Sequence, residues 1–263
     1  MIMEDSSFYI FTVLSGIIGL CVGSFLNVVV YRLPKGMSLA FPPSHCPRCG
    51  HEIKWYDNIP VLSYIILGGR CRFCRGRISF RYTVTEIACG ALWTACALIF
   101  GREHLAYSLI AMLVCAVCIC VFFIDLEHMV IYDRFQIILA AAAAAMVFLD
   151  PDYGWLSHLI GFAASSVLFI GVAAVMGRIL KREALGGGDV KFAMSSGLML
   201  GWQKFLLMLL AASLSASVYM IYKKKKNGES REIPFAPFLT AGLITALLAG
   251  NAVIEAYRGF LGF

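Results

Sequence analysis

The sequence predicts an all-α polytopic membrane protein, with about eight transmembrane helices and a small cytoplasmic zinc-binding insertion after the first helix. Hydrophobic residues make up 60% of the 263 residues and charged residues only 14%, whereas soluble domains carry about a quarter charged residues. The apolar residues form blocks of about 15 to 25 residues, enough to cross about 30 Å of hydrocarbon. Basic residues lie in alternate gaps between these blocks, as in multi-pass proteins.

Each apolar block is expected to be a helix, because a segment in hydrocarbon must satisfy its own backbone hydrogen bonds. One block, 192–200, is short for a span and is interrupted at 201–204, so it is the weakest of the eight. Residues 150–154 form a turn by composition. In chain order the blocks cover about residues 8–30, 83–100, 105–124, 135–149, 155–177, 192–200, 205–222 and 233–257.

The basic residues predict the orientation of the chain. If the first terminus lies outside, the inside gaps contain 19 of the 22 Lys and Arg residues, all except Arg102, Lys204 and Arg258. The positive-inside rule therefore places both termini in the periplasm. The inside gaps are then 31–82, 125–134, 178–191 and 223–232.

The basic residues behind the net charge of +6 lie where membrane orientation requires them. We therefore expect membrane lipid as a neighbour and no nucleic-acid partner. The run Lys223–Lys226 is typical of a topological anchor, although it can also bind anionic lipid. We expect three domains: a first transmembrane helix at 1–30, a cytoplasmic four-cysteine domain at 31–82, and a membrane domain at 83–263.

Four of the ten cysteines form two Cys-x-x-Cys pairs in the polar segment, Cys46/Cys49 and Cys71/Cys74. Two such pairs complete a tetrahedral zinc site with no open position, which is typical of structural rather than catalytic zinc. About 50 residues with few large aliphatic side chains build little core, so the metal is expected to hold this domain together. Two disulfides or four free thiols are the alternatives, and a cytoplasmic location argues against disulfides. The other six cysteines lie in apolar blocks and are interpreted as packing residues.

Two acidic residues lie at the cytoplasmic ends of apolar blocks, where ionisable groups are costly. Asp125 ends the third block, and Asp189 follows three glycines, Gly186 to Gly188, just before the sixth. The glycines allow unusual backbone conformations and the close approach of another chain. Two carboxylates held together share a proton, so one can activate water while the other polarises a carbonyl, as in aspartic proteolysis. Taken singly, Asp125 is compatible with a solvated or capping role, and Asp189 with a capping role at a helix start.

These motifs, in this order, resemble the type IV prepilin peptidases, a family of Gly-x-Gly-Asp membrane aspartic proteases. The resemblance covers nearly the whole chain. Besides both cysteine pairs, the Asp125 stretch and Gly186-Gly-Gly-Asp189-Val-Lys191, it rests on Gly23-Ser-Phe-Leu-Asn-Val-Val-Val-Tyr-Arg-Leu-Pro34, Trp55-Tyr-Asp-Asn-Ile-Pro-Val-Leu-Ser-Tyr64, Arg81-Tyr-Thr-Val-Thr-Glu86 and Ile233-Pro-Phe-Ala-Pro-Phe238.

The resemblance implies an inner-membrane enzyme with two activities. It would remove the short basic leader of type IV prepilins or pseudopilins at the cytoplasmic face, and then N-methylate the new terminus with S-adenosylmethionine. By the same resemblance Asp125 and Asp189 are catalytic, Gly186, Gly187, Gly188 and Lys191 form the active-site loop, and Cys46, Cys49, Cys71 and Cys74 bind zinc.

Methylation rests on the resemblance alone, because no glycine-rich nucleotide loop follows a predicted strand. The residues Asn27 and Glu86 fit family strings without an assigned role, and Glu86 is equally compatible with a buried hydrogen-bonding acid. The family commonly has Pro-Asp where this chain has Tyr132-Asp133, which leaves the proposed pair untouched.

Two other functions fit parts of the pattern. One is a related protease that cuts archaellin-like or signal-peptide substrates, against which the cysteine domain argues. The other is a non-enzymatic transporter or zinc-linked sensor, in which membrane acids relay protons. The position of both acids at one face, rather than near mid-bilayer, argues against transport.

Overall fold

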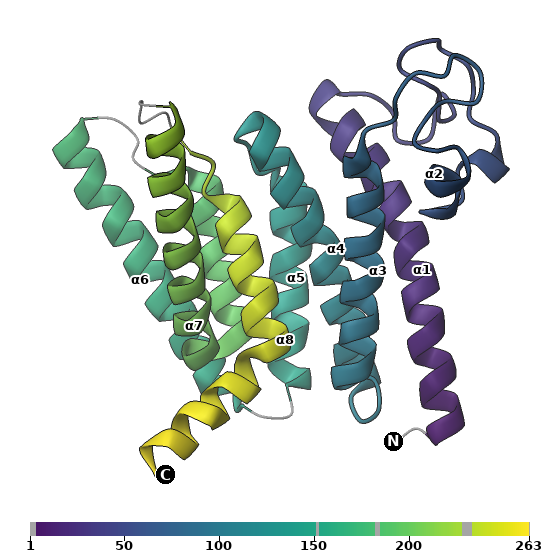
Figure 1. Cartoon of the computed structure of the whole chain (residues 1–263). Coiled ribbons are helices and arrows are strands. Elements are labelled where there is room, and N and C mark those ends of the chain that lie inside the picture. The colour runs from purple at the N-terminus through teal and green to yellow at the C-terminus, as the bar shows by residue number, and fades with distance from the viewer. Residues whose placement is uncertain (1–3, 151–152, 182–184, 228–232, 263) are drawn as a thin grey trace. The chain divides into compact units, whose positions relative to one another are not determined.

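The computed structural model describes residues 4–150, 153–181, 185–227 and 233–262, and over these residues the chain is helical without a β-strand (Figure 1). The only extended pairings within those ranges are two isolated bridges, His45 with Glu52 and Arg70 with Arg77. The predicted all-α class is therefore confirmed.

The chain divides into two compact units, Met1–Cys120 and Val121–Phe263. The first contains α1 (Asp5–Arg32), α3 (Phe80–Phe100) and the larger part of α4 (Leu105–His128). The last turns of α4 belong to the second unit.

Helices α1 and α3 run antiparallel and side by side (Figure 1), and glycines on one face of α1 bring them close. A Cβ atom on Gly19 would lie 2.9 Å from Gly90 Cα, and one on Gly23 would lie 2.7 Å from Glu86 Cα. Small residues at a spacing of four are a common means of close helix packing in membranes.

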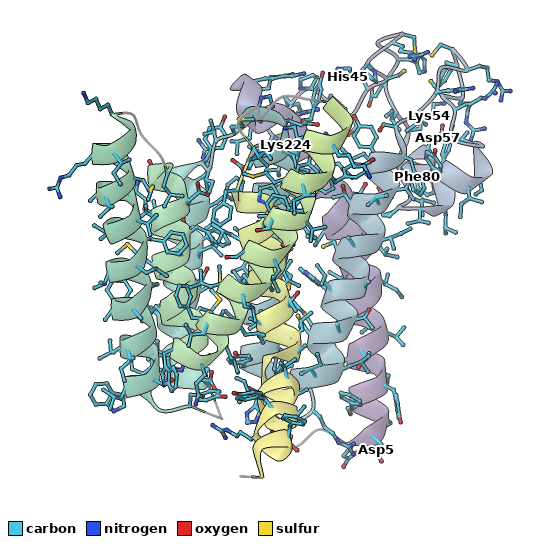
Figure 2. All side chains as sticks on the ribbon, turned by 60° about the vertical axis from the view of Figure 1, so that its left-hand side comes forward. Asp5, His45, Lys54, Asp57, Phe80 and Lys224 are labelled. Carbon is cyan, nitrogen blue, oxygen red and sulfur yellow. The ribbon has the colours of Figure 1, made fainter. Side chains whose placement is uncertain are left out.

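The polar segment between α1 and α3 folds into irregular loops with three short helices: η1 (Leu33–Lys35), η2 (Trp55–Asp57) and α2 (Leu62–Ile66). We call this segment the cysteine module. Figure 2 shows it, with His45, Lys54 and Asp57, at the end of α3 that begins at Phe80, whereas Asp5 lies at the opposite end of α1. The buried guanidinium of Arg32 anchors it by donating to the carbonyl oxygens of Pro42 at 2.6 Å and Ser38 at 3.0 Å.

The second unit contains α5 (Asp133–Leu149), α6 (Trp155–Leu180), α7 (Gly187–Asn227) and α8 (Ala236–Leu261). Helix α7 is its centre and packs against α5, α6 and α8. The buried side chains that form this core are Phe192, Met199, Leu200, Phe205, Met208, Leu239 and Leu243.

Helix α7 reverses direction at Gly201, which has non-helical angles of φ 71° and ψ 169°. Before the reversal, Leu198 accepts a hydrogen bond from His158 at the start of α6. After it, Lys204 lies against Gly250 in the later part of α8, whereas Tyr219 stacks on Phe238 near the start of α8. Asp189, at the start of α7, interacts with Asp125, which binds Ala236 at the start of α8. The chain of α7 therefore leaves the level of the start of α8 and returns to it at Tyr219, so α7 is two antiparallel segments.

Six helices are long and apolar enough to cross a membrane, over the residues that the structure describes. The multi-pass character is therefore supported, whereas the count of eight spans stays a prediction. The difference arises at α5, which has only 17 residues, and at α7, which covers both the sixth and the seventh predicted spans.

Lys204 was expected in an exterior loop, but it lies within α7 and is 2% exposed. Its ammonium lies 4.8 Å from the ring centroid of Tyr153, and the alkyl chain packs on Gly250. The predicted break at 201–204 is therefore confined to Gly201. Of the predicted turn at 150–154, residues 151 and 152 lie outside the described residues.

Candidate active site

Asp125 lies in the last turn of α4 and is 6% exposed. Its Oδ2 atom accepts a hydrogen bond from the backbone N–H of Ala236, the first residue of α8, at 3.2 Å. The amino end of a helix carries partial positive charge and unpaired N–H groups. Helix α8 therefore holds this buried carboxylate in a defined orientation.

Asp189 lies in the first turn of α7, in the same unit as Asp125. Its N–H donates to the carbonyl oxygen of Gly186 at 3.0 Å, which closes the turn that begins the helix. The two carboxylates are near enough to interact electrostatically. Residues 64 positions apart in sequence thus come within electrostatic range of each other.

The three glycines before Asp189 act by leaving space. None of them has a positive φ angle, so the expectation that they allow unusual conformations is wrong. Among the described residues, a Cβ atom on Gly187 would meet nothing within 4 Å, and one on Gly186 would approach only Asp189 Oδ2, at 3.4 Å. The backbone beside the Asp189 carboxylate is therefore open to another chain.

Two residues that sequence reasoning missed fix the position of this turn. The buried Gln136 of α5 donates through Nε2 to the carbonyl oxygen of Gly188 at 2.8 Å. Ile131 packs against Gly188, where a Cβ atom would lie 3.0 Å from Ile131 Cβ. The one sequence signal was a polar residue, Gln136, inside an apolar block. Lys191, assigned to the active-site loop, forms an exposed ion pair with Asp133 at 2.6 Å.

This arrangement suits hydrolysis of a peptide bond. One carboxylate is buried and fixed by a backbone donor, and the second stands beside backbone that no described side chain covers. Two interacting carboxylates at such a site can hold a water molecule and divide the acid and base roles between them.

In the other unit, the Sγ atoms of Cys46, Cys49, Cys71 and Cys74 all lie within 4.8 Å of one another. The Cys46 and Cys74 sulfurs are 3.8 Å apart. Tetrahedral zinc with Zn–S bonds of about 2.3 Å requires sulfurs about 3.8 Å apart. The donor set and its spacing therefore fit such a metal.

The thiols of this cluster differ in acidity. Burial opposes ionisation of Cys46, but backbone N–H groups of Cys49 and Arg48 and neighbouring thiols outweigh it and lower the pKa to about 7. For Cys49, the N–H of His51 favours the thiolate, yet burial and the neighbouring Cys46 and Cys74 raise the pKa to about 11. The cluster is therefore only partly ionised near neutral pH, and a metal that binds all four sulfurs must displace protons.

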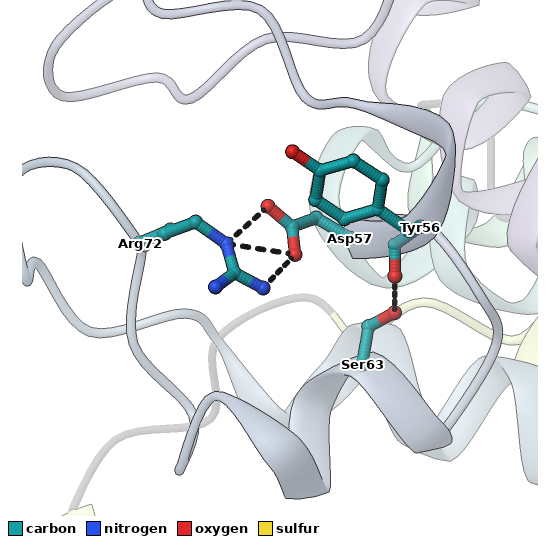
Figure 3. Close-up of polar contacts among 4 residues, drawn as sticks. All are labelled: Tyr56, Asp57, Ser63 and Arg72. Atoms are coloured by element: carbon teal, nitrogen blue, oxygen red, sulfur yellow. Dashed lines mark hydrogen bonds and ion pairs between the residues drawn. The ribbon is translucent and has the colours of Figure 1, made fainter.

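An ion pair braces the module next to this cluster. Arg72 donates to Asp57 through Nε at 2.8 Å and through Nη2 at 2.5 Å (Figure 3). The hydrogen bonds and charge of Arg72 hold the pKa of Asp57 below its usual range. This pair ties η2 to the second Cys-x-x-Cys pair.

The two residues without an assigned role also find partners in the first unit. Asn27 donates through Nδ2 to the carbonyl oxygens of Gly23 and Tyr82, at 3.2 and 3.1 Å. Glu86 is 8% exposed, and its Oε2 atom accepts the N–H of Val61 at 2.8 Å. Glu86 is therefore a buried hydrogen-bonding acid.

Comparison with known proteins assigns both units to one family. Residues 17–100 match the bacterial peptidase A24 N-terminal domain, and residues 112–221 match the type IV leader peptidase family. No solved structure matches the chain significantly.

Curated relatives carry the name prepilin leader peptidase/N-methyltransferase. The protein from Pseudomonas aeruginosa is 32% identical over 94% of this chain and 93% of its own length. The one from Bacillus subtilis is 31% identical over 92% and 95%. The one from Myxococcus xanthus is 38% identical over 84% of this chain, which spans only 65% of that longer protein. The chain therefore belongs to the type IV leader peptidase family, among the prepilin leader peptidase/N-methyltransferases.

Proposed function

We propose that this protein is a membrane aspartic endopeptidase that removes the basic leader of type IV prepilins or pseudopilins, with Asp125 and Asp189 as its catalytic residues. It then N-methylates the new amino terminus with S-adenosylmethionine. The observation that supports the proposal is the electrostatic interaction of the two carboxylates beside glycine backbone that no described side chain covers. Membership of the leader peptidase family supports the choice of substrate.

In this mechanism the substrate is a transmembrane helix whose leader lies on the cytoplasmic side. The substrate backbone approaches Asp189 along Gly186 and Gly187, where no side chain of the described residues intervenes. Asp125 and Asp189 share one proton. The ionised carboxylate takes a proton from water as the water attacks the carbonyl carbon, and the protonated one donates to the carbonyl oxygen.

Methylation uses the terminus that cleavage creates. S-adenosylmethionine supplies an electrophilic methyl group bonded to a sulfonium. When bound, S-adenosylmethionine would supply the methyl group, and the amine of the new terminus would accept it.

The four cysteines are proposed to hold a structural zinc ion, since all four positions are thiolates and none is open for a substrate. We further propose that the protein lies in the inner membrane with both termini in the periplasm. The cysteine module and both aspartates then face the cytoplasm, as the distribution of basic residues favours.

The test is co-expression with a type IV prepilin in cells that lack their own peptidase, with the pilin amino terminus determined by mass spectrometry. Asp125→Asn and Asp189→Asn should each reduce cleavage by about 10²- to 10⁴-fold or more, since each removes a proton-transferring group. Asp5→Asn is the matched control, because Asp5 is an exposed acid paired with Arg102 in the other unit.

A pilin that is shortened and methylated by the wild type, but uncut by both aspartate variants, supports both activities and the site. A shortened but unmethylated pilin removes the methyltransferase half. Cleavage by either aspartate variant at the control rate contradicts the proposed pair. If the wild type cuts no pilin of several classes, the transporter or sensor alternative is favoured instead.

A further inference from the structure

The short helix α2 of the cysteine module presents an exposed apolar face. Its residues Leu62, Ile65 and Ile66 are 56%, 66% and 75% exposed. Residues three and four positions apart lie on one face of a helix, so these side chains form one aliphatic stripe. The opposite face of α2 packs on the module, because the buried Ser63 donates through Oγ to the carbonyl oxygen of Tyr56 at 3.1 Å (Figure 3).

Contacts with α3 place α2 beside that helix rather than beyond its end. The N–H of Val61, immediately before α2, donates to Glu86 Oε2 at 2.8 Å. The ring centroids of Tyr64 and Phe80 lie 5.9 Å apart. Phe80 begins α3 and Glu86 lies six residues later, so at 1.5 Å per residue α2 flanks roughly the first 9 Å of α3. Figure 1 shows α2 in this position.

This position gives α2 a depth in the membrane. Helix α3 is one of the six helices long and apolar enough to cross a bilayer. Its 21 residues span about 31 Å, close to the roughly 30 Å of hydrocarbon. When α3 spans the bilayer, its first residue therefore lies at one hydrocarbon edge. Interfacial helices bury their apolar faces to a depth of about 5–10 Å, which is the level of α2.

Turns at both ends of α2 fix it there. Val61 has φ 61° and ψ −50°, a conformation rare for a β-branched residue. It forms the centre of a tight γ-turn, in which the N–H of Leu62 donates to the carbonyl oxygen of Pro60 at 2.6 Å. After α2, Gly68 and Gly69 have φ angles of 59° and 67°, which glycine adopts readily. A strained residue such as Val61 persists where the surrounding structure holds it, often at functional sites.

Two arginines lie just beyond the same end of α3. Arg70 and Arg77 form an isolated antiparallel bridge, and Arg77 precedes Phe80 by three residues. Both side chains are exposed, and neither forms an ion pair with an acid among the described residues. Like charges directly opposite each other are unfavourable, so this pair favours an anion beside it.

The aliphatic stripe and the arginine pair together match an anionic phospholipid. Its acyl chains would meet the stripe at the edge of the hydrocarbon, and its phosphate would meet the arginines at headgroup level. The planar guanidinium group binds phosphate oxygens in a bidentate manner. The charge of the whole module is complementary to such a surface, because residues 31–82 contain nine Lys and Arg residues but only two Asp and Glu residues.

We infer that α2 anchors the cysteine module in the membrane interface. Leu62, Ile65 and Ile66 insert among the acyl chains of one leaflet, and Arg70 and Arg77 bind the headgroup phosphate of an anionic phospholipid. In the proposed orientation this is the cytoplasmic leaflet. The inference goes beyond the proposed function, since it requires neither peptidase nor methyltransferase activity.

The first experiment asks whether the stripe contacts lipid. In full-length protein in lipid nanodiscs, Ile66 is replaced by p-benzoylphenylalanine, which on irradiation forms a covalent bond to a neighbouring C–H carbon. The intact mass then shows whether a phospholipid is attached. The same replacement at Ile17, 54% exposed on α1, is the lipid-facing control. At Glu52, it is the control outside the membrane, because Glu52 pairs with His45, which Figure 2 shows beyond Phe80 on the side away from Asp5.

Lipid attachment at Ile66 should be close to that at Ile17 and well above that at Glu52. A yield at Ile66 no higher than at Glu52, with Ile17 labelled, overturns the inference. Prepilin cleavage is not part of either readout, so failure of the proposed peptidase leaves this result unaffected, and failure of the anchor leaves the peptidase proposal standing.

The second experiment tests the arginine pair through the headgroup of the lipid attached at Ile66. The nanodiscs contain equal amounts of phosphatidylglycerol and phosphatidylcholine with identical acyl chains. Phosphatidylglycerol should be enriched by about fivefold or more, since each basic residue at a membrane surface contributes about that factor. Arg70→Gln combined with Arg77→Gln should bring the two lipids close to equal labelling. Arg178→Gln combined with Arg258→Gln, which removes two exposed arginines of the second unit, should leave the enrichment unchanged.

The total lipid attached at Ile66 shows whether α2 stays in place in the arginine variant. Equal labelling by the two lipids in the wild type overturns the assignment of the phosphate to Arg70 and Arg77, as does an enrichment that survives the loss of both arginines.

Discussion

Two adjacent glycines of the proposed active-site loop, Gly187 and Gly188, should respond in opposite ways to the addition of one methyl group. At Gly187 a Cβ atom meets nothing within 4 Å. Alanine there gains helix propensity, so Gly187→Ala should stabilise the fold by about 0.5–1 kcal/mol or leave it unchanged. At Gly188 the new atom would lie 3.0 Å from Ile131 Cβ. The resulting overpacking, about 1–3 kcal/mol, should exceed the same gain, so Gly188→Ala should lower the melting temperature.

The assays are thermal unfolding of the purified variants in one detergent and cleavage of one prepilin substrate. If the substrate backbone uses the open space beside Asp189, Gly187→Ala should lose at least about tenfold in cleavage while its fold is intact, because about 1.4 kcal/mol of lost transition-state binding is tenfold in rate. Equal melting temperatures for the two variants would refute the packing argument. Full cleavage by Gly187→Ala would refute the role of that space.

Three further predictions follow from other parts of the chain. Gly197→Ala would place a Cβ atom 2.5 Å from the carbonyl oxygen of Gly161, whereas Gly171→Ala meets nothing within 4 Å; only the first should lower the melting temperature, by overpacking of about 1–3 kcal/mol. Chelation, like Cys46→Ser, should remove metal from the cysteine module and destabilise the first unit. Because the metal displaces thiol protons, its apparent affinity should rise between about pH 6 and 8. An unchanged metal content in Cys46→Ser would contradict the four-thiolate site. Because Arg72 depresses the pKa of Asp57, their ion pair stabilises the fold above the ordinary carboxyl range and loses that contribution as pH falls below about 4. Arg72 is half exposed, so solvent screens the pair and the contribution is small. The stability difference between wild type and Arg72→Gln should therefore shrink in acid, and a difference that grows would show the sign to be wrong.

Sequence reasoning proposed the two aspartates because the predicted topology places them at one level and a family resemblance matches both positions. Alternate gaps between apolar blocks must share a membrane face, so Asp125 and Asp189 were expected together without any knowledge of packing. The cysteine pairs were equally accessible, since metal-ligand spacing is a local property.

What the sequence left open depends on tertiary contacts. The donor to Asp125 is the backbone of Ala236, and a backbone N–H has no sequence signature beyond the start of a helix. The strain at Val61 was invisible because valine ordinarily avoids positive φ. The glycines before Asp189 were recognised, but whether they supply conformational freedom or space depends on neighbours such as Ile131.

The reversal of α7 at Gly201 has a consequence for the lipid around the enzyme. Asp189 and Gly201 are twelve residues apart, so the segment between them rises about 18 Å, well short of the roughly 30 Å of hydrocarbon. The end of this segment at Gly201 is not expected to move deeper into the hydrocarbon, because the buried polar residues His158 and Lys204 lie near it. The mismatch must be absorbed by a locally thinner bilayer or by headgroups and water drawn down toward Asp189. If Asp189 is catalytic as proposed, the thickness of the bilayer would then influence how readily a substrate helix exposes its cleavage site to this residue.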